Sequence, residues 1–408
     1  MGLDLKSLYA IGNLGVHFWA HVFRRIFKRP KPGEELQKFN SYYAPDLLTP
    51  LTAADRESLF GWEQCINCGA CAEVCPVYRP SEAGSYRAPD TMTVSLSRSF
   101  PEFGPARDSI FNCAQCGACK AACTRGIDIP GLVMFVRRKT MEIKDPRLMK
   151  LYGPSLERVA NGQPVFGDPQ IDLAEFRKEK AEMVFFVGCV GRTLTAQTTK
   201  KTLSFLRDLG ADFTTIDEKC AGCIHWASGA GLENYAGVEA NIEMIRATGA
   251  RRVVTADPHV LEIMRSHPPY RDAFETVHLT EFLAGLQFKV RRAETPLAYH
   301  DPCFLGRRGG VFDAPRELIR RLGTEPIELK HHGPDSLCCG SAEGTFILDP
   351  AVADGVNARR MAEVRASGAQ VLLTECPACI AAFRSTADKS VQVYSIAEYL
   401  ADRYIPGQ

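Results

Sequence analysis

Apolar and amphipathic segments take turns along the second half of the chain. A short apolar run at 183–188 (MVFFVG) precedes a helix-like stretch at 193–209, and a second run at 251–256 (RRVVTA) precedes another at 258–266. Short apolar runs that alternate with segments of helical periodicity are typical of βα units around a parallel sheet. The pattern therefore predicts an α/β fold from about residue 181 onward.

The same half of the chain contains an internal repeat. The segment ATGARRVVTADPHV at 247–260 is answered by ASGAQVLLTECPACI at 366–380 after a one-residue offset, which gives a period near 119 residues. A repeated segment at a fixed period indicates two copies of one structural unit. We expect two pseudo-symmetric α/β repeats, at 181–290 and at 295–402.

The first 30 residues carry a different pattern. Residues 8–27 are mostly apolar, but a polar stripe at helical spacing interrupts them, formed by Asn13, His17, His21 and Arg24. Basic residues and prolines follow directly, which fits an interfacial amphipathic helix better than a membrane span. We expect a docking helix at 1–30 that lies on a membrane or on a membrane-embedded partner, followed by a polar linker at 31–60. A helix packed on the protein's own core is the alternative.

Composition narrows the classes of function. The 49 Lys and Arg residues nearly balance the 48 Asp and Glu residues, so no large field of one sign favours nucleic acid, and we expect no binding to it. The 16 cysteines fall in metal-ligand spacings within a long chain. This usage indicates thiols kept reduced in the cytoplasm rather than disulfides.

Eight of the cysteines form two matching runs. Each run reads C-x2-C-x2-C-x3-C, the bacterial ferredoxin pattern, in which the fourth thiolate of one run crosses to the cluster of the other. One cubane [4Fe-4S] centre is thus assigned to Cys65, Cys68, Cys71 and Cys123, and a second to Cys113, Cys116, Cys119 and Cys75. The 37 residues between the runs include a helical pattern near 90–99, so we expect a mainly helical ferredoxin-like domain at 61–150. Zinc bound by the eight thiols is the alternative, although zinc sites usually show pairs of C-x2-C.

Five further cysteines form the motif C-x34-CC-x36-C-x2-C near the C-terminus. They are Cys303, Cys338, Cys339, Cys376 and Cys379. Thiolate is the ligand that iron–sulfur sites select, and five thiols exceed the four that a cubane cluster or a zinc site needs. The motif therefore predicts an unusual cluster that performs chemistry as well as carrying electrons. Neighbouring groups for proton supply are His300, Asp301, His331 and His332, and those for charge compensation are Lys219 and Arg307 or Arg308.

The first repeat has lost part of this motif. In the alignment of the two repeats, Cys189 and Cys220 match Cys303 and Cys338, whereas the other three ligand positions hold Ala221, Asp257 and Val260. An extra Cys223 leaves two interpretations open. The thiols bind a metal together with Asp257 or His225, or they remain as small core residues of an emptied pocket. We favour the emptied pocket, which would face the intact site and receive a substrate or a partner's cysteine arm.

Together, these motifs resemble the CCG-domain proteins typified by the D-type component of heterodisulfide reductase, in which a ferredoxin domain is fused to two cysteine-rich repeats. The resemblance spans about 60–400 and is carried by the two ferredoxin runs and by HDPC (300–303), LCCGSAEG (337–344) and ECPACIAAF (375–383). It implies one noncubane [4Fe-4S] cluster on the five-cysteine motif, fed by the two cubane clusters. In this family such a site reduces or forms a disulfide.

With one intact five-cysteine set, the chain is more similar to catalytic subunits of bacterial membrane complexes in sulfur metabolism than to the methanogen enzyme. The resemblance implies a peripheral subunit on the cytoplasmic, inner face of the membrane. Its partners would be a cytochrome b-type or quinone-reactive subunit and a thiol or disulfide substrate, small or protein-borne. The alternative is a non-catalytic electron-transfer subunit that serves a flavoprotein dehydrogenase of the glycolate, lactate or glycerol-3-phosphate type. Since the chain has no G-x-G-x-x-G motif after a strand, any flavin would be bound by the partner.

Overall fold

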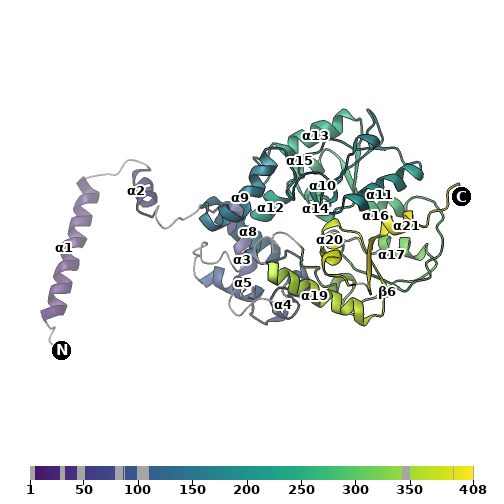
Figure 1. Ribbon diagram of the computed structural model, residues 1–408. Coiled ribbons are helices and arrows are strands. Elements are labelled where there is room, and N and C mark those ends of the chain that lie inside the picture. The colour runs from purple at the N-terminus through teal and green to yellow at the C-terminus, as the bar shows by residue number, and fades with distance from the viewer. Residues whose placement is uncertain are drawn as a thin grey trace. The chain divides into compact units, whose positions relative to one another are not determined.

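The computed structural model divides the chain into two compact units, Met1–Leu51 and Thr52–Gln408. It describes residues 5–27, 33–43, 51–78, 86, 88–98, 110–341, 350–388 and 390–407. Figure 1 shows the second unit as two α/β halves with a helical part at one end.

The first unit contributes two described helices, α1 (Leu5–Phe27) and α2 (Glu34–Tyr43). The amphipathic helix predicted from the sequence is confirmed as α1. Its aromatic side chains form a row, with the ring centroids of Trp19 and Phe23 6.2 Å apart and those of Phe23 and Phe27 6.1 Å apart, as expected for residues four apart on one face. Within the described part of the chain, no helix is both long and apolar enough to cross a bilayer. The second helix, α2, lies where we expected only a linker, and its acidic first turn suits the helix dipole.

The second unit begins earlier than the expected end of the linker, with α3 (Ala53–Trp62). Thr52 and Asp55 form a reciprocal capping box in which the Asp55 carboxylate accepts from the Thr52 backbone N–H at 2.9 Å. Trp62 is buried, and its Nε1–H donates to the carbonyl of Asp128 at 3.0 Å. A capped start and an anchored aromatic residue stabilise this helix, which the polar, proline-containing sequence before it obscured.

The two ferredoxin runs lie in a mainly helical region, as predicted. Among the described residues, its further helices are α4 (Ala70–Glu73), α5 (Pro89–Arg98), α7 (Ala118–Ala122), α8 (Ile129–Glu142) and α9 (Pro146–Ala160). The helix expected near 90–99 is α5. The short helices α4 and α7 contact each other, and each contains the third cysteine of its run, so the two runs lie side by side.

Two four-stranded parallel sheets confirm the two α/β repeats. The strand order is β2-β1-β3-β4 in the first and β6-β5-β7-β8 in the second, and every neighbouring pair is parallel. The strands are β1 (Met183–Phe185), β2 (Phe213–Thr214), β3 (Arg252–Thr255), β4 (Glu275–His278), β5 (Leu297–Tyr299), β6 (Ile327–Glu328), β7 (Val371–Thr374) and β8 (Gln392–Ser395). The matching order shows that both repeats share one topology.

Helices connect the strands and hold the repeats together. In the first repeat they are α10 (Gly188–Arg192), α11 (Ala196–Asp208), α12 (Cys223–Ser228), α13 (Gly237–Ala247), α14 (Pro258–Ser266), α15 (Pro268–Arg271) and α16 (Leu279–Ala284). In the second they are the π-helical turn η3 (Phe304–Arg308), α17 (Asp313–Arg320), α19 (Pro350–Ala366), α20 (Pro377–Thr386) and α21 (Ile396–Ala401). Helix α11 contacts α21, and α16 contacts α17. In each repeat, the helix after the first strand (α11 or α17) contacts the helix after the last strand of the other repeat (α21 or α16). The two contacts are therefore related by a pseudo-twofold axis. Both contribute to one shared apolar core.

The sheet topology places the cysteine segments at one edge of each sheet. In the second repeat, β5, β6 and β7 lead in turn to Cys303, to the adjacent cysteines 338 and 339, and to Cys376. Carboxyl ends of parallel strands point to the same edge, and the chain reverses its strand order between β5 and β7. Ligand sites of open α/β sheets form at this switch point, so the fold itself brings the distant cysteines together.

The helical part and the first repeat meet where α8 contacts α12. Arg137 is fully buried, and its guanidinium donates to the carbonyl of Ala227 at 2.9 Å and to that of Cys113 at 2.6 Å. Gly229, which ends α12 with a φ of +83°, approaches α8 so closely that an added Cβ would lie 2.5 Å from the Arg137 backbone. Only glycine meets both requirements.

We expect Gly229→Ala to lower the thermal unfolding midpoint strongly, because it adds a backbone clash to the strain of a left-handed residue. Gly126→Ala is the matched control, since Gly126 has a φ of +67° and open space around it. The control should lose only about 1 kcal/mol for the backbone conformation. Thermal unfolding of the anaerobically purified variants measures both effects, and equal midpoints for the two would contradict the close contact.

Candidate metal centres

The two ferredoxin runs have the same local geometry. In each, the residue before the second cysteine has a positive φ, 55° at Asn67 and 53° at Gln115, and the glycine after that cysteine has a φ of 77° at Gly69 and Gly117. These left-handed residues turn the chain sharply on either side of the second cysteine, and the backbone N–H of Gln115 donates to the Cys113 sulfur at 3.4 Å. Such N–H groups stabilise thiolates. The runs are therefore two copies of one ligand loop.

The fourth cysteine of the first run lies with the second run. Burial is the main cause that raises the pKa of Cys75 to about 12, and the nearby thiolates of Cys116 and Cys113 add to it. Cys75 also donates to the Tyr86 hydroxyl at 3.7 Å. Cys71 instead has Cys65 of its own run nearby, and burial is the main cause of its raised pKa of about 11. Cys75 thus lies beside cysteines of the second run, as the predicted crossing requires, and the two crossed ligand sets stay a prediction.

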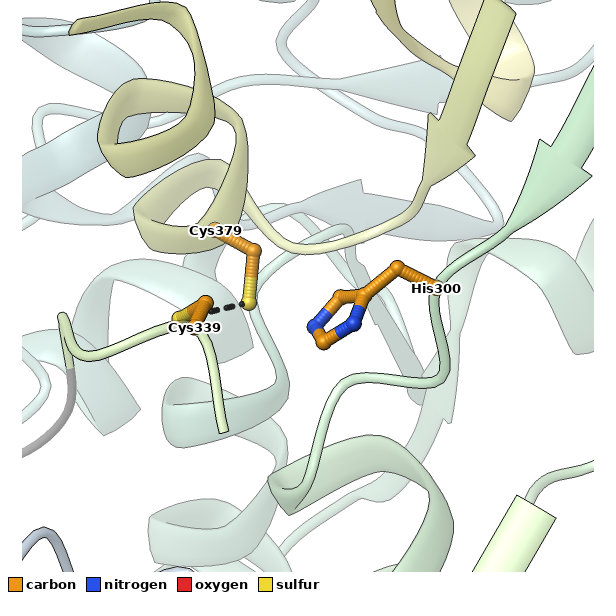
Figure 2. A group of neighbouring side chains, drawn as sticks. All are labelled: His300, Cys339 and Cys379. Atoms are coloured by element: carbon orange, nitrogen blue, oxygen red, sulfur yellow. Dashed lines mark hydrogen bonds between the residues drawn. The ribbon is translucent and has the colours of Figure 1, made fainter. Parts of the chain in front are cut away.

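The five cysteines of the second repeat converge in the interior. Each is at most 5% exposed. Cys303 precedes η3, Cys376 caps α20 and Cys379 lies one turn later, while Cys338 and Cys339 come from the loop after β6. Hydrogen bonds link their sulfurs in the order Cys303, Cys338, Cys339, Cys379 and Cys376. The Cys379 and Cys339 sulfurs are 3.2 Å apart (Figure 2).

Hydrogen bonds among the five sulfurs lower the pKa of some thiols and raise that of others. Hydrogen bonds from Cys338 and Cys379 lower the pKa of Cys339 to about 6. Burial opposes ionisation of Cys376, but hydrogen bonds from Cys379 and His259 lower its pKa to about 6 as well. The pKa of Cys303 is raised, first by its hydrogen bond to Cys338 and then by burial. Two of the five are thus held as thiolates near neutral pH, the form that binds a metal.

His300 adds a buried donor that faces these sulfurs. One of its ring nitrogens and the sulfurs of Cys339 and Cys379 all lie within 4.8 Å of one another. Figure 2 shows these three side chains. Its Nδ1 accepts from the Nε of Arg360 at 3.1 Å, so the proton is on Nε2, which is buried and has no hydrogen-bond partner. Burial, and then Arg360 and Arg307, lower the pKa of this imidazole well below its usual range. A neutral ring that offers a buried N–H toward sulfur fits a site for a sulfur-rich cluster.

A left-handed glycine allows the loop after the cysteine pair to pass close to α19. Gly340 has a φ of +86°, and an added Cβ would lie 2.4 Å from the carbonyl oxygen of Ala353. Its N–H donates to the Cys338 sulfur at 3.4 Å. The CCG sequence thus needs its glycine for both conformation and space.

The first repeat contributes a side chain that the sequence did not identify. The ring of His259 hydrogen-bonds the Cys376 sulfur across the repeat boundary, and its Nδ1 lies 3.0 Å from the Asp257 carboxylate. Asp257 also caps α14 by accepting from the His259 N–H at 2.9 Å. The alignment marked Asp257 as a substitute for a lost ligand, whereas the structure shows it orienting a histidine toward the other repeat. A carboxylate two residues before a histidine at a helix start is the signal that would have found it.

Arg307 connects the ferredoxin runs to the five-cysteine site. Its Nε donates to the carbonyl of Cys116 at 2.8 Å, and its Nη1 donates to the carbonyls of Pro334 and Ser336 on the loop that leads to Cys338. The guanidinium is also close enough to Cys116, Cys303 and Cys338 for their charge to act on its pKa. Arg307 is therefore the cation between the second ferredoxin run and the five cysteines.

The other charged candidates from the sequence have partners elsewhere. Arg308 pairs with Glu262 at 2.6 Å, and the Lys219 side chain lies against Gly162. His331 pairs with Glu363, and His332 hydrogen-bonds the carbonyl of Leu329 at 2.8 Å. Asp301 binds Arg316 at 2.7 Å and accepts from the N–H of Gly333 at 2.8 Å. These contacts give them structural roles.

A cavity of about 290 Å³ lies between the two repeats. One wall carries Cys189 and Cys220 of the first repeat, and the facing wall carries Cys339 and Gly340 of the second. Its described lining is largely apolar, includes Asp257 and residues of α12 and α20, and contains no lysine or arginine. The degenerate site and the intact site thus open into one space.

Two family models match the chain. The 4Fe-4S dicluster domain matches residues 61–127, and the cysteine-rich CCG domain matches twice, at 183–259 and 297–384. The chain is an iron–sulfur protein with two CCG domains. The degenerate repeat is therefore a member of the same domain family as the intact one.

Known relatives place this CCG-domain protein among redox subunits. It is 26% identical over 364 residues to the D-type component of dihydromethanophenazine:CoB–CoM heterodisulfide reductase from Methanosarcina mazei, covering 78% of this chain and 87% of the relative. It is 24% identical to the EtfAB:quinone oxidoreductase of Syntrophomonas wolfei, covering 94% of this chain and 64% of that protein. A crystal structure of a hypothetical protein from Helicobacter pylori, 10% identical, has a TM-score of 0.53 over 90% of this chain and 75% of that one, which indicates a shared fold. The chain is an iron–sulfur electron-transfer subunit related to both named relatives.

We expect Arg307→Lys to destabilise the CCG-domain protein by roughly 2 kcal/mol, because lysine keeps the charge but cannot reach three carbonyls from a planar fork. Arg308→Lys is the matched control, since it alters a neighbouring ion pair and should change stability by less than about 1 kcal/mol. Anaerobic chemical denaturation of the two variants measures the difference. Similar stabilities would contradict the bridging role of Arg307.

Proposed function

We propose that the chain passes electrons through two cubane [4Fe-4S] clusters to or from a noncubane [4Fe-4S] site that reduces or forms a disulfide. The observation that carries this proposal is the buried chain of five hydrogen-bonded sulfurs in the second repeat, with the unpartnered His300 N–H beside it. Relatives named as heterodisulfide reductase subunits support the same chemistry.

The proposed cubane ligands are the two crossed sets of the ferredoxin runs. Cys65, Cys68, Cys71 and Cys123 would hold one cluster, and Cys113, Cys116, Cys119 and Cys75 the other. The proximity of Cys75 to Cys113 and Cys116 supports the crossing. The five cysteines of the second repeat would hold the noncubane cluster, which supplies one-electron steps and an iron able to bind a thiolate.

The order of the centres follows from burial and contacts. Cys68 of the first run is exposed, so electrons would enter or leave the chain there. Cys116 of the second run and Cys303 lie close enough for their charges to interact, and Arg307 contacts the loops of both. The second cubane site is therefore the neighbour of the five-cysteine site, and the first is the outer one.

Residues around the five cysteines would support the reaction without being ligands. The Nε2–H of His300 would donate to sulfur, and Arg360 keeps this proton in place by occupying Nδ1. Asp257 orients His259 toward Cys376 by the opposite arrangement, because its carboxylate accepts from Nδ1 of that ring. Such hydrogen bonds set the orientation and potential of a metal site.

The second candidate function is electron transfer without disulfide chemistry, in a complex with a flavoprotein. The similarity to EtfAB:quinone oxidoreductase over 94% of this chain favours it. Both functions use the ferredoxin clusters, and they differ in whether a thiol reacts at the five-cysteine site.

We expect Cys339→Ser to lower the iron content from about twelve to about eight atoms per chain, since it removes a ligand of one four-iron cluster. Thiol–disulfide turnover and any thiol-dependent EPR signal should disappear, while the signals of both cubane clusters remain. Iron and sulfide analysis with EPR measures this, and Cys223→Ser is the control. Unchanged iron content would exclude a cluster at the five cysteines, and unchanged turnover would exclude them as the reacting site. Absence of thiol–disulfide turnover in the unaltered protein would favour the flavoprotein function.

We also propose that the chain docks on the inner face of the cytoplasmic membrane through α1, beside a cytochrome b-type or quinone-reactive subunit. The exposed aromatic row of Trp19, Phe23 and Phe27 supports this, together with the basic residues Arg24 and Arg25 in its last turn. An aromatic row with basic side chains next to it suits a lipid surface.

Phe23→Ser should weaken binding to vesicles of phosphatidylcholine and phosphatidylglycerol by about tenfold, because it removes roughly 1.5–3 kcal/mol of apolar burial. His21→Ser, on the polar stripe, should bind like the unaltered chain. Cosedimentation of the full-length proteins measures both. Vesicle binding that does not depend on Phe23 would indicate that α1 contacts another protein.

A further inference from the structure

The first CCG repeat keeps a pair of cysteines in hydrogen-bond contact. Cys189 follows β1 after a turn at Gly188, and Cys220 follows β2. The side chains of the two cysteines hydrogen-bond each other. The buried carboxylate of Glu218 fixes the turn by accepting from the N–H groups of Val187 at 2.9 Å and of Gly188 at 2.7 Å. The pair is therefore held by the fold.

Hydrogen-bond donors lower the pKa of one member of the pair, Cys220. The N–H of Gly222 donates to the Cys220 sulfur at 3.4 Å. The thiol of Cys189 lowers the pKa of Cys220, and backbone N–H groups of Gly222, Ile224 and Cys223 lower it further against the effect of burial. Donors of this kind favour the nucleophilic form of a cysteine. Tyr235 holds the same loop by donating to the Cys220 carbonyl at 3.0 Å.

The rest of the first repeat does not complete a metal site. Ala221 and Val260 stand where the second repeat has cysteines, and Asp257 is engaged by His259 and by the start of α14. His225 stacks on Tyr235 with ring centroids 4.2 Å apart, and burial lowers its pKa to about 4. Among the described residues, the group of three possible metal ligands that lie within 4.8 Å of one another is His300, Cys339 and Cys379, all in the second repeat.

The pair opens into the cavity that the intact site also lines. Cys189, Cys220 and the neighbouring Cys223 face this space together with Cys339, in an otherwise mostly apolar lining of Val165, Phe166, Val190, Leu194 and Ile224. Without a lysine or arginine in the described lining, and with Asp257 and Asp354 present, the cavity disfavours anionic ligands. An uncharged disulfide suits it.

We propose that Cys189 and Cys220 form a redox-active dithiol that reduces uncharged disulfides entering this cavity. The Cys220 thiolate attacks one sulfur of R–S–S–R, the S–S bond breaks, and one half leaves as a thiolate that takes up a proton. Cys189 then loses its proton and attacks the Cys220 sulfur, which releases the second half as a thiol. Two cysteine thiols become one internal disulfide, and one external disulfide becomes two thiols.

Two electrons and two protons restore the dithiol. The electrons arrive one at a time from the iron–sulfur electron-transfer system of the chain, so this inference rests on the proposed function for its return step only. The exchange step needs the two thiols alone. Its test is therefore independent of whether the five cysteines hold a noncubane cluster.

The test uses the full-length, anaerobically purified protein and the disulfide of 2-mercaptoethanol, without added reductant. After alkylation of free thiols, peptide mapping should find a Cys189–Cys220 disulfide. Cys189→Ser should accumulate a mixed disulfide between 2-mercaptoethanol and Cys220, because the resolving thiol is missing. Cys223→Ser should still form the internal disulfide. Cys339→Ser should form it too, which separates this site from the one described above.

The charge of the probe tests the cavity. The disulfide of 2-mercaptoethanesulfonate has the same ethyl linkers but two negative charges, and we expect it to react at least about tenfold more slowly, equivalent to about 1.4 kcal/mol in the barrier. Equal rates for the two probes would overturn the assigned substrate class.

Three outcomes would overturn the dithiol itself. They are the absence of a Cys189–Cys220 disulfide in protein with full iron content, a Cys220–Cys223 disulfide in its place, or loss of iron or zinc in Cys189→Ser or Cys220→Ser. The last result would mean that the thiols are metal ligands. Iron analysis of each variant also confirms that it has folded.

Discussion

Buried arginines hold the sulfur-bearing loops of this protein in place. Arg137 is fully buried between the helical part and the first repeat, and its guanidinium donates to the carbonyls of Cys113 and Ala227. Arg307 makes the equivalent connection between the Cys116 loop and the second repeat. A buried cation is costly unless its donors are paired. Here backbone carbonyls accept from both terminal nitrogens of Arg137 and from Nε and Nη1 of Arg307, while nearby thiolates supply the opposite charge. The second ferredoxin run is therefore held by two cations that belong to other segments of the chain.

The two CCG repeats show how one topology supports two kinds of thiol site. Both sheets place their sulfur-bearing loops at the carboxyl ends of the same three strands, so the backbone that receives the ligands is common to both. What differs is the segment after the third strand, which supplies Cys376 and Cys379 in one repeat and Asp257 and Val260 in the other. Losing that segment does not leave the first repeat inert. Its Asp257 and His259 now serve the intact site, and its remaining cysteine pair faces the shared cavity.

The sequence predicted the parts of this structure that depend on local spacing. The helical ferredoxin part, the α/β repeats and the amphipathic first helix each follow from short-range periodicity, and the structure confirms all three. The convergence of the five cysteines followed from their resemblance to a known motif. The contact between His259 and Cys376 could not be predicted, because it depends on the pseudo-twofold packing of two repeats and not on either segment alone. The sequence left open whether Arg307 or Arg308 lies at the five cysteines, because the π-helical turn η3 directs these adjacent arginines to different partners. The start of the compact unit at Thr52 depends on a capping interaction.

Charge is distributed unevenly around the five cysteines, and under the proposed function this asymmetry would separate the path of electrons from that of the substrate. Arg307 lies on the side of the ferredoxin loops and Arg360 behind His300, while the described lining of the cavity contains neither of them. Positive charge on the electron-transfer side stabilises added negative charge on sulfur in a medium of low dielectric constant. An apolar wall without cations on the other side excludes water and anions from the same sulfurs. Under the proposed function, an electron would reach the five-cysteine site past guanidinium groups, whereas a disulfide would approach from a direction in which only an uncharged molecule is favoured.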